Sequence, residues 1–170
     1  MILRKQTMTF DYKASMTKGH KYNELVGKRI ASEGISCTVP ELYLVKDLSE
    51  IPDMTKYEKD IILDPIDEVL EVKSRDLWFT DDLRTYPHNN LIVDTVSGYD
   101  TKQQKPMGYV FVSQRAGGMI CLPTYTKDTW EKKVLYDKYR DLHDTFYIAS
   151  IEHCKPFAAL VKHIKERIDQ

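Results

Sequence analysis

Residues 59–75 read Lys-Asp-Ile-Ile-Leu-Asp-Pro-Ile-Asp-Glu-Val-Leu-Glu-Val-Lys-Ser-Arg, which is the pattern of two short strands joined by a turn. Residues 64–67, Asp-Pro-Ile-Asp, suit a type I turn, because Asp is favoured at its first position and Pro at its second. If this turn closes an antiparallel hairpin, Ile61 faces Leu70 and Asp60 faces Glu71. The segment therefore predicts a hairpin with a defined register.

This register separates the hairpin into an apolar face and a charged face, because side chains alternate along a strand. The apolar face comprises Ile61, Leu63, Leu70 and Val72, and the other face comprises Asp60, Ile62, Val69, Glu71 and Lys73. A one-residue slip would turn the apolar set outward, so the pattern resists that error. Two carboxylates across a strand pair repel each other, and a cation bound between them would reverse the sign. Two alternatives stay open: the charged face is simply solvated, or Asp64 replaces Asp60 as the working acid.

The rest of the chain alternates predicted helices and strands. We expect a first helix at 18–33 with an apolar stripe, ended by Gly34, and a final helix at 157–168 that Pro156 opens. The stripe of the first helix is Tyr22, Leu25, Val26 and Ile30. A helix is also expected at 128–142, and strands at 35–39, 90–96, 109–113, 119–122 and 146–149. The order predicts an α/β fold with a mixed central sheet flanked by helices, in one domain spanning 1–170.

The composition is that of a soluble globular protein, with 170 residues of which 42% are hydrophobic and 30% are charged. No apolar run is long enough to cross a membrane, and residues 1–5 lack the apolar core of a signal peptide. Three scattered cysteines form no metal-ligand spacing and no disulfide framework. An intracellular, cytoplasmic setting is therefore expected. The net charge of −1 combines a basic part at 1–34 with an acidic stretch at 41–71. This fits either a metal site flanked by phosphate-binding surface or ordinary salt bridges.

A Glu-containing helix, a strand, Asp60-Ile61-Ile62-Leu63, a turn and Glu71-Val72-Lys73-Ser74 follow one another in this chain. This arrangement resembles the PD-(D/E)XK nuclease superfamily, which has the restriction-endonuclease-like fold. The resemblance covers residues 20–98 by order of elements, and its specific part is Asp60 with Glu71-Val72-Lys73. The Pro of the family motif is absent, since Lys59 precedes Asp60, and many members lack it.

The resemblance implies a metal-dependent nuclease that hydrolyses phosphodiester bonds, with DNA and endonucleolytic cutting favoured. Asp60, Glu71 and the carbonyl of Val72 would hold Mg²⁺, for which Mn²⁺ could substitute. Lys73 would orient the attacking water and stabilise charge on the phosphate. Glu24, on the first helix, is the candidate fourth catalytic residue, and its alternative is a surface pair with Lys28.

A second class of function stays open at this point. The chain could be a non-catalytic nucleic-acid-binding or protein-interaction module in which Asp60, Glu71 and Lys73 form only a salt-bridged surface. Residues 102–105, Lys-Gln-Gln-Lys, fit either phosphate contact or a solvated loop, and Arg75 fits either a phosphate contact or an ion pair. A homodimer would suit a nuclease that cuts both strands of DNA.

Overall fold

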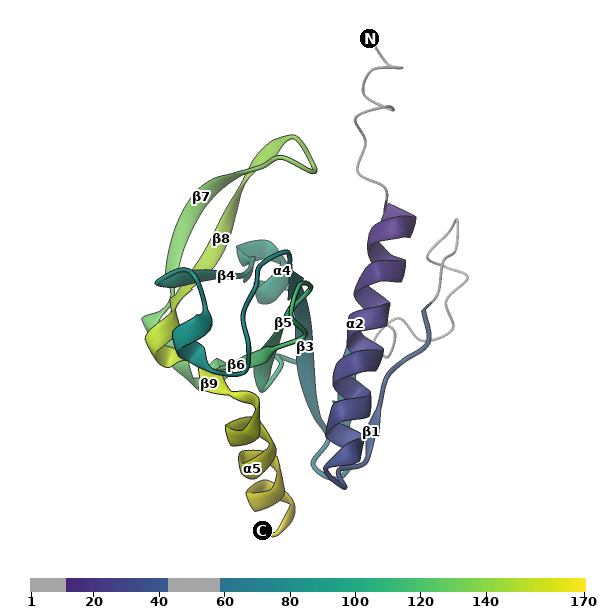
Figure 1. Cartoon of the computed structure of the whole chain (residues 1–170). Coiled ribbons are helices and arrows are strands. Elements are labelled where there is room, and N and C mark those ends of the chain that lie inside the picture. The colour runs from purple at the N-terminus through teal and green to yellow at the C-terminus, as the bar shows by residue number, and fades with distance from the viewer. Residues whose placement is uncertain (1–11, 43–58) are drawn as a thin grey trace.

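The centre of the molecule is a six-stranded mixed sheet in the order β1-β2-β3-β5-β6-β9. A computed structural model describes residues 12–42 and 59–170 (Figure 1). The strands of this sheet are β1 (Cys37–Thr38), β2 (Ile61–Leu63), β3 (Glu68–Arg75), β5 (Gly108–Ser113), β6 (Met119–Pro123) and β9 (Lys155–Pro156). β3 and β5 are parallel, and the other neighbours are antiparallel. The predicted α/β class with a mixed central sheet and helices is confirmed.

The hairpin of β2 and β3 has the predicted register, since Ile61 pairs with Leu70 and Leu63 pairs with Glu68. The turn hydrogen bond starts one residue earlier than the predicted turn at 64–67, because the N–H of Ile66 donates to the Leu63 carbonyl at 3.3 Å and so closes residues 63–66. Asp67 ends the turn at a φ of 50°, a left-handed conformation that Asp tolerates better than most residues.

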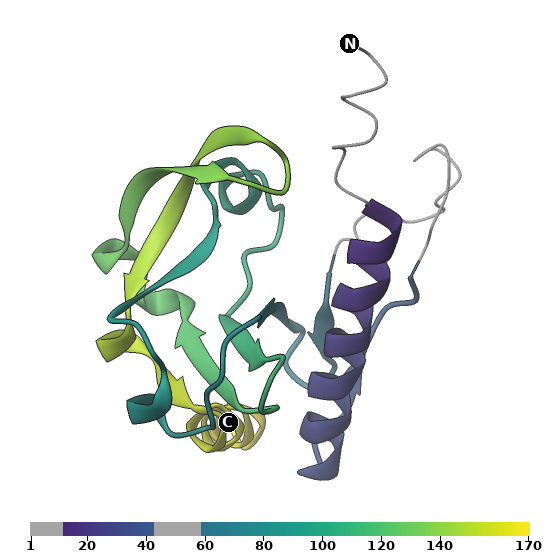
Figure 2. The same cartoon turned by 45° about the horizontal axis from the view of Figure 1, so that its top comes forward.

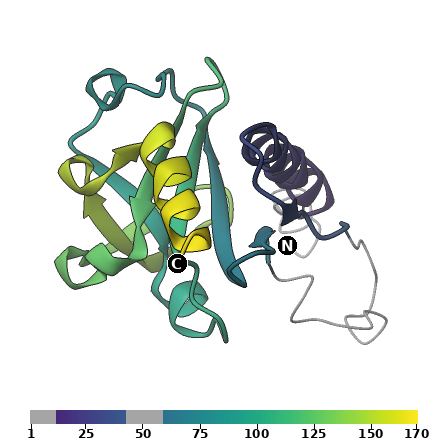
Figure 3. The same ribbon diagram turned by 90° about the horizontal axis from the view of Figure 1, so that it is seen from below.

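Two helices cover the apolar face of the hairpin, namely α2 (Tyr12–Ser32) and α5 (Phe157–Ile168). All four residues of the predicted apolar face are buried in one core with residues of both helices. Figure 3 shows the two helices from below, next to the strands that they cover. Gly34 follows α2 at a φ of 81°, as expected of a glycine that ends a helix. Leu25 does not belong to the buried stripe, because its exposed fraction is 43%.

A second sheet lies against the opposite face of the central sheet. Its order is β4-β8-β7, with the strands β4 (Asn90–Thr95), β7 (Glu131–Asp137) and β8 (Leu142–Ser150). The core between the sheets is rich in aromatic rings, among them Tyr109, Phe111, Trp130 and Tyr147. The short elements are η2 (Leu83–Thr85), α4 (Val96–Asp100), η3 (Thr124–Thr129) and η4 (Ile151–His153).

The helix predicted at 128–142 is wrong, because this segment forms β7, a tight turn and the start of β8. Its apolar residues recur at helical spacing, but pairing with β8 and the burial of Trp130 between the sheets outweigh that local preference. The turn is fixed by Arg140, which forms ion pairs with Asp137 and Asp144. Asp141 takes a φ of 52°, which an α-helix does not allow.

The remaining predicted strands are present, although the one expected at 35–39 is reduced to Cys37–Thr38. The connection at 41–57 falls almost entirely outside the described residues. Within 12–42 and 59–170, no helix combines the length and apolar character needed to cross a membrane. Cys37, Cys121 and Cys154 are free thiols.

Candidate functional site

Asp60 lies directly before β2 and is held by β3 and α2. Its Oδ2 accepts a hydrogen bond from the Val72 N–H at 2.8 Å, and its Oδ1 accepts one from the Asn23 side-chain amide at 3.1 Å. The pairing of β2 with β3 ends at Ile61, and beyond it the Asp60 carboxylate, in place of a backbone carbonyl, accepts the Val72 N–H of β3. This fixes the acid at the open end of the hairpin, beside the strand that carries Glu71.

Glu71 and Lys73 project from β3 toward the second sheet. The Lys73 Nζ lies 3.2 Å from Glu71 Oε1 and 3.5 Å from Asp94 Oδ1. Lys102, which follows α4, lies 3.2 Å from Asp94 Oδ2 and 3.8 Å from Glu71 Oε1. We call Asp60, Glu71, Lys73, Asp94 and Lys102 the charged cluster, which joins the β2–β3 hairpin to β4 and to the segment after α4.

The charged cluster is largely shielded from solvent. The exposed side-chain fractions are 12% for Glu71, 9% for Asp94 and 24% for each lysine. Burial strengthens the interactions between charges, but it also removes their hydration, so such a cluster costs free energy unless its charges are paired and hydrogen-bonded.

The pKa of Asp60 is raised to about 7, first by burial and then by the negative charge of Glu71. The hydrogen bond from Val72, the charge of Lys73 and the Asn23 amide act in the opposite direction but do not cancel these effects. Asp60 is therefore a carboxyl group that holds its proton up to neutral pH, because burial and the charge of Glu71 disfavour its ionised form.

Lys73 and Asp94 stay charged. Burial lowers the pKa of Lys73, but the charges of Glu71, Asp94 and Asp60 together raise it above its ordinary value. Burial raises the pKa of Asp94, but Lys73, Lys102 and a hydrogen bond from Tyr109 leave it below its ordinary value. Lys73 is thus a fixed cation and not a proton acceptor at neutral pH.

Of two neighbouring residues, Tyr109 contacts the charged cluster and Arg75 does not. The Tyr109 hydroxyl donates to Asp94 Oδ2 at 3.1 Å, and Tyr109 pairs with Glu71 across β3 and β5. Arg75 does not join the charged cluster. Its guanidinium donates to the Ile92 carbonyl at 2.7 Å and lies over the Phe111 ring, which connects β3 with β4.

The backbone of Val72 faces the same edge as Asp60. The N–H and C=O of one strand residue point to the same side, and the Val72 N–H points at Asp60. The Val72 carbonyl therefore also points past the end of β2, beside the Asp60 carboxylate. The family resemblance implies this carbonyl as a third oxygen ligand.

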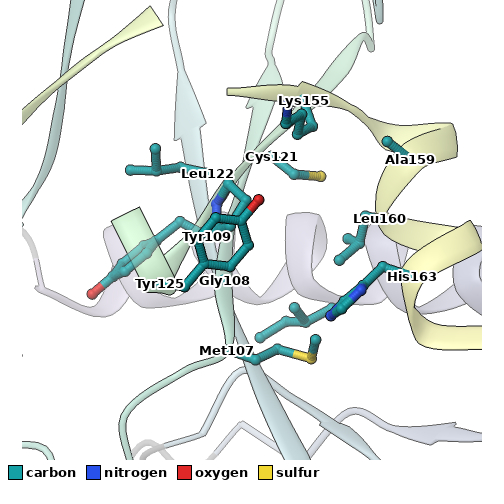
Figure 4. A pocket seen from close by; sticks show the side chains of 12 residues that line it. Met107, Gly108, Tyr109, Cys121, Leu122, Tyr125, Lys155, Ala159, Leu160 and His163 are labelled. Carbon is teal, nitrogen blue, oxygen red and sulfur yellow. The ribbon is translucent and has the colours of Figure 1, made fainter. Parts of the chain in front are cut away.

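A cavity of about 280 Å³ opens beside Glu71. Its lining includes Lys59, Lys102, Gln103 and Gln104, which are cationic or carry amide donors. A second cavity, of about 170 Å³, lies on the other side of the sheet under α5 (Figure 4). That cavity is mainly apolar, lined by residues such as Met107, Leu122 and Leu160, and no carboxylate lines it. Of these two cavities, the one beside Glu71 has the polar groups for a phosphate.

Glu24 has a different environment from the one expected. Its side chain is exposed to 54%, and its Oε1 lies 3.2 Å from His20 Nε2. The preceding residue, Asn23, is the α2 residue that contacts Asp60. Asp64, the alternative acid, accepts hydrogen bonds from Ser36 and Thr38 and serves the β1–β2 connection.

Sequence reasoning missed Asn23, Asp94 and Tyr109 as members or neighbours of the charged cluster. One local feature of the sequence points to Asp94 as a candidate site residue, since it is an acid that follows the apolar residues 91–93 of β4. No such feature points to Asn23, because its role depends on how α2 packs against β3. Lys102 was noted only as part of a polar loop.

The described residues contain no group of three or more His, Cys, Asp or Glu side chains arranged to hold a metal ion. Two carboxylates and a backbone carbonyl nevertheless fit Mg²⁺, which often takes one or two protein carboxylates and completes its shell with water and substrate phosphate. No protein-family model, curated protein or solved structure matches this chain.

Proposed function

We propose that the protein is a divalent-metal-dependent nuclease of the PD-(D/E)XK type, with a restriction-endonuclease-like fold, that cuts phosphodiester bonds in DNA. One observation carries this proposal: the Asp60 carboxylate accepts the Val72 N–H at 2.8 Å, which holds this acid beside the strand that carries Glu71 and Lys73. Burial, and then the negative charge of Glu71, raise the pKa of Asp60 to about 7. Two adjacent carboxyl groups repel each other when both are ionised, and a divalent cation bound between them would offset this repulsion. The order of helix, strand, Asp60 strand and Glu71-Val72-Lys73 strand also supports the proposal.

The donor set suits a hard cation. Asp60, Glu71 and the Val72 carbonyl supply oxygen atoms only, which favours Mg²⁺ or Mn²⁺ over softer metals. When bound, such an ion polarises the scissile phosphate and lowers the pKa of a bound water. Because Asp60 must lose its proton to become a ligand, metal binding is expected to strengthen as pH rises through about 7.

Lys73 supplies positive charge where negative charge develops on the phosphate. Its raised pKa means that it donates hydrogen bonds and does not accept a proton. Its ion pairs with Glu71 and Asp94 hold the ammonium group in place, so little reorganisation is needed during the reaction. Asp94 is accordingly a positioning residue, since it touches both lysines of the charged cluster.

The cavity beside Glu71 provides a place for the substrate phosphates. Lys59 and Lys102 line it with positive charge, and Gln103 and Gln104 carry amide donors. Lys102 also contacts Asp94 and Glu71, so it connects the substrate cavity with the charged cluster. Glu24 keeps its proposed role only as a residue that reaches the metal through water or a second ion, whereas Asn23 contacts Asp60 directly.

One feature favours the alternative of a non-catalytic module. Glu71 and Asp94 are both paired with lysines, so most of the cluster's charge is compensated without a metal ion. In that case the cluster would be a structural ion-pair network between the two sheets, and its removal would affect folding and not catalysis. The two functions therefore predict different consequences of the same substitutions.

The test is a cleavage panel on supercoiled, linear duplex, branched and single-stranded DNA. We expect cleavage with Mg²⁺ or Mn²⁺ and none in EDTA. Activity that persists in EDTA would exclude the metal mechanism, and a folded protein that cleaves no nucleic acid would favour the non-catalytic module.

A further inference from the structure

The β7–β8 hairpin extends beyond the central sheet as a separate arm. Figures 1 and 2 show this arm rising from the second sheet and curving over the end of the molecule where α4 lies. It is built from β7 and the first part of β8, and Arg140 ties its turn to Asp137 and Asp144. The two strands are called here the ribbon.

The strand register assigns the residues of the ribbon to two faces. Lys132 pairs with Tyr147, Val134 with Thr145, and Tyr136 with His143. Tyr147 is buried between the two sheets, and the Lys132 ammonium lies 5.8 Å from the centre of its ring. These six residues therefore form the inner face, which looks toward the central sheet.

Charge is distributed unevenly between the two faces. Among the paired residues, the inner face has no acid, whereas Glu131, Asp137 and Asp144 belong to the outer face. The Lys127 ammonium also lies over the Tyr147 ring, at 4.4 Å from its centre. Three acids lie next to the inner face: Asp94 pairs with Tyr147 across β4 and β8, and Asp100 and Asp141 accept the hydroxyl hydrogen bonds of Tyr147 and Tyr136. The inner face is thus flanked by lysines at its base.

Apolar and aromatic groups are exposed on the same face. Val134 is exposed to 63% and Tyr136 to 54%, and the Tyr136 ring lies 5.3 Å from the His143 ring. Exposed aromatic rings and a cationic side chain on one face are the features that bind unpaired bases and their phosphates, and a duplex would keep its base faces covered. This favours a single strand over a duplex as the occupant.

The inner face is continuous with the charged cluster. Asp94 pairs with Tyr147, which pairs with Lys132, so the three residues form one row across the second sheet. Strands are spaced by about 4.8 Å, which sets the Lys132 backbone about 10 Å from that of Asp94. The Tyr136–His143 pair lies four residues farther along β7, or about 13 Å at ~3.3 Å per residue.

We propose that the inner face of the ribbon holds a single-stranded segment of nucleic acid next to the bond that is cut. Bases stack on Tyr136 and His143, and Lys132 contacts the phosphate backbone. This inference rests on the proposed nucleic-acid substrate, and it assigns the substrate class and the surface that selects it.

The experiment uses adjacent lysines on opposite faces of β7. Lys132→Glu and Lys133→Glu make the same change of charge at two exposed positions, and only Lys132 belongs to the inner face. Binding of a short fluorescent oligodeoxynucleotide is followed by anisotropy in EDTA, so that no cleavage is required. We expect Lys132→Glu to weaken binding of the single strand about tenfold or more relative to Lys133→Glu. Tyr136→Ala combined with His143→Ala should also weaken it about tenfold or more.

Three results would overturn the inference: equal effects of the two lysine changes, tighter binding of the same sequence as a duplex, or no binding of the single strand. Thermal melting of each variant checks that the fold is retained, and the lysine pair keeps the test informative if the aromatic changes disturb the ribbon. The nuclease proposal is judged separately. Metal-dependent cleavage with equal binding by the two lysine variants would reject the ribbon alone. Ribbon-dependent binding without cleavage would reject the nuclease alone.

Discussion

The two faces of β3 differ in where their partners come from. On one face, Leu70 and Val72 pack in the core that α2 and α5 cover. On the other face, Glu71 and Lys73 meet Asp94 from the second sheet and Lys102 from the segment after α4. The apolar face needs only bulk and water exclusion, whereas the charged face needs specific atoms at specific distances. Changes on the first face should therefore alter stability, and changes on the second should alter metal binding and chemistry.

The largest effect is expected from removing either acid. Asp60→Ala and Glu71→Ala should each reduce Mg²⁺-dependent cleavage by about 10³-fold or more, because the ion's contribution to the transition state is worth several kcal/mol. Initial cleavage rates at saturating Mg²⁺ measure this. Near-normal rates in both variants would reassign the two acids to the structural network.

The matching change on the apolar face is Leu70→Ala. Leu70 is fully buried, so its truncation should lower the free energy of unfolding by about 2–5 kcal/mol. The cleavage rate per folded molecule should stay nearly unchanged. Urea unfolding measures the stability, and a loss of rate that exceeds the unfolded fraction would show that the two faces are not independent.

Lys73→Ala separates the cation from the acids. The rate should fall by about 10²–10³-fold, as expected for the loss of one preorganised donor to the transition state. Metal affinity should not weaken, because removing a nearby positive charge favours cation binding. Single-turnover rates with a metal titration test this, and a parallel loss of metal affinity would contradict the assigned role.

The raised pKa of Asp60 predicts a pH dependence of stability in the metal-free protein. The folded-state value is about 7 and the unfolded value is about 3.9, so between them the folded state holds a proton that the unfolded state has lost. Stability should therefore fall as pH rises through this window, by up to about 1.4 kcal/mol per pH unit from this group. Urea unfolding in EDTA across that range measures the slope. Asp60→Asn should reduce the slope, and an unchanged slope would place the proton elsewhere.

The smallest effects distinguish two neighbours on α2. Asn23→Ala removes a donor to Asp60 and should lower the cleavage rate about tenfold, since outer contacts of metal ligands typically matter at that level. Glu24→Ala removes a surface pair with His20 that is worth a few tenths of a kcal/mol. Cleavage rates of the two variants, measured in parallel, distinguish the two roles. A larger loss of rate in Glu24→Ala than in Asn23→Ala would restore Glu24 as the fourth catalytic residue.

The difference between the apolar face and the charged face of β3 also explains what the sequence could predict. The hairpin register and its buried face follow from a turn and a two-residue alternation, which are local, and both are present in the structure. The strands at 90–96, 109–113 and 119–122 were also found from local patterns. The helix assigned to 128–142 failed because pairing with β8 decides that segment. Asp94 and Asn23 could not be predicted as neighbours of Lys73 and Asp60, because their contacts depend on packing between distant elements.

The central claim is that Asp60 and Glu71 together hold a divalent cation. Calorimetric titration of Mn²⁺ into the metal-free protein, at a pH near the Asp60 pKa of about 7, tests this claim directly. We expect saturable binding that releases protons as Asp60 ionises, that is lost in Asp60→Asn and Glu71→Gln, and that is retained in Lys73→Ala. Absence of binding to the wild-type protein, or equal binding by all three variants, would contradict the claim.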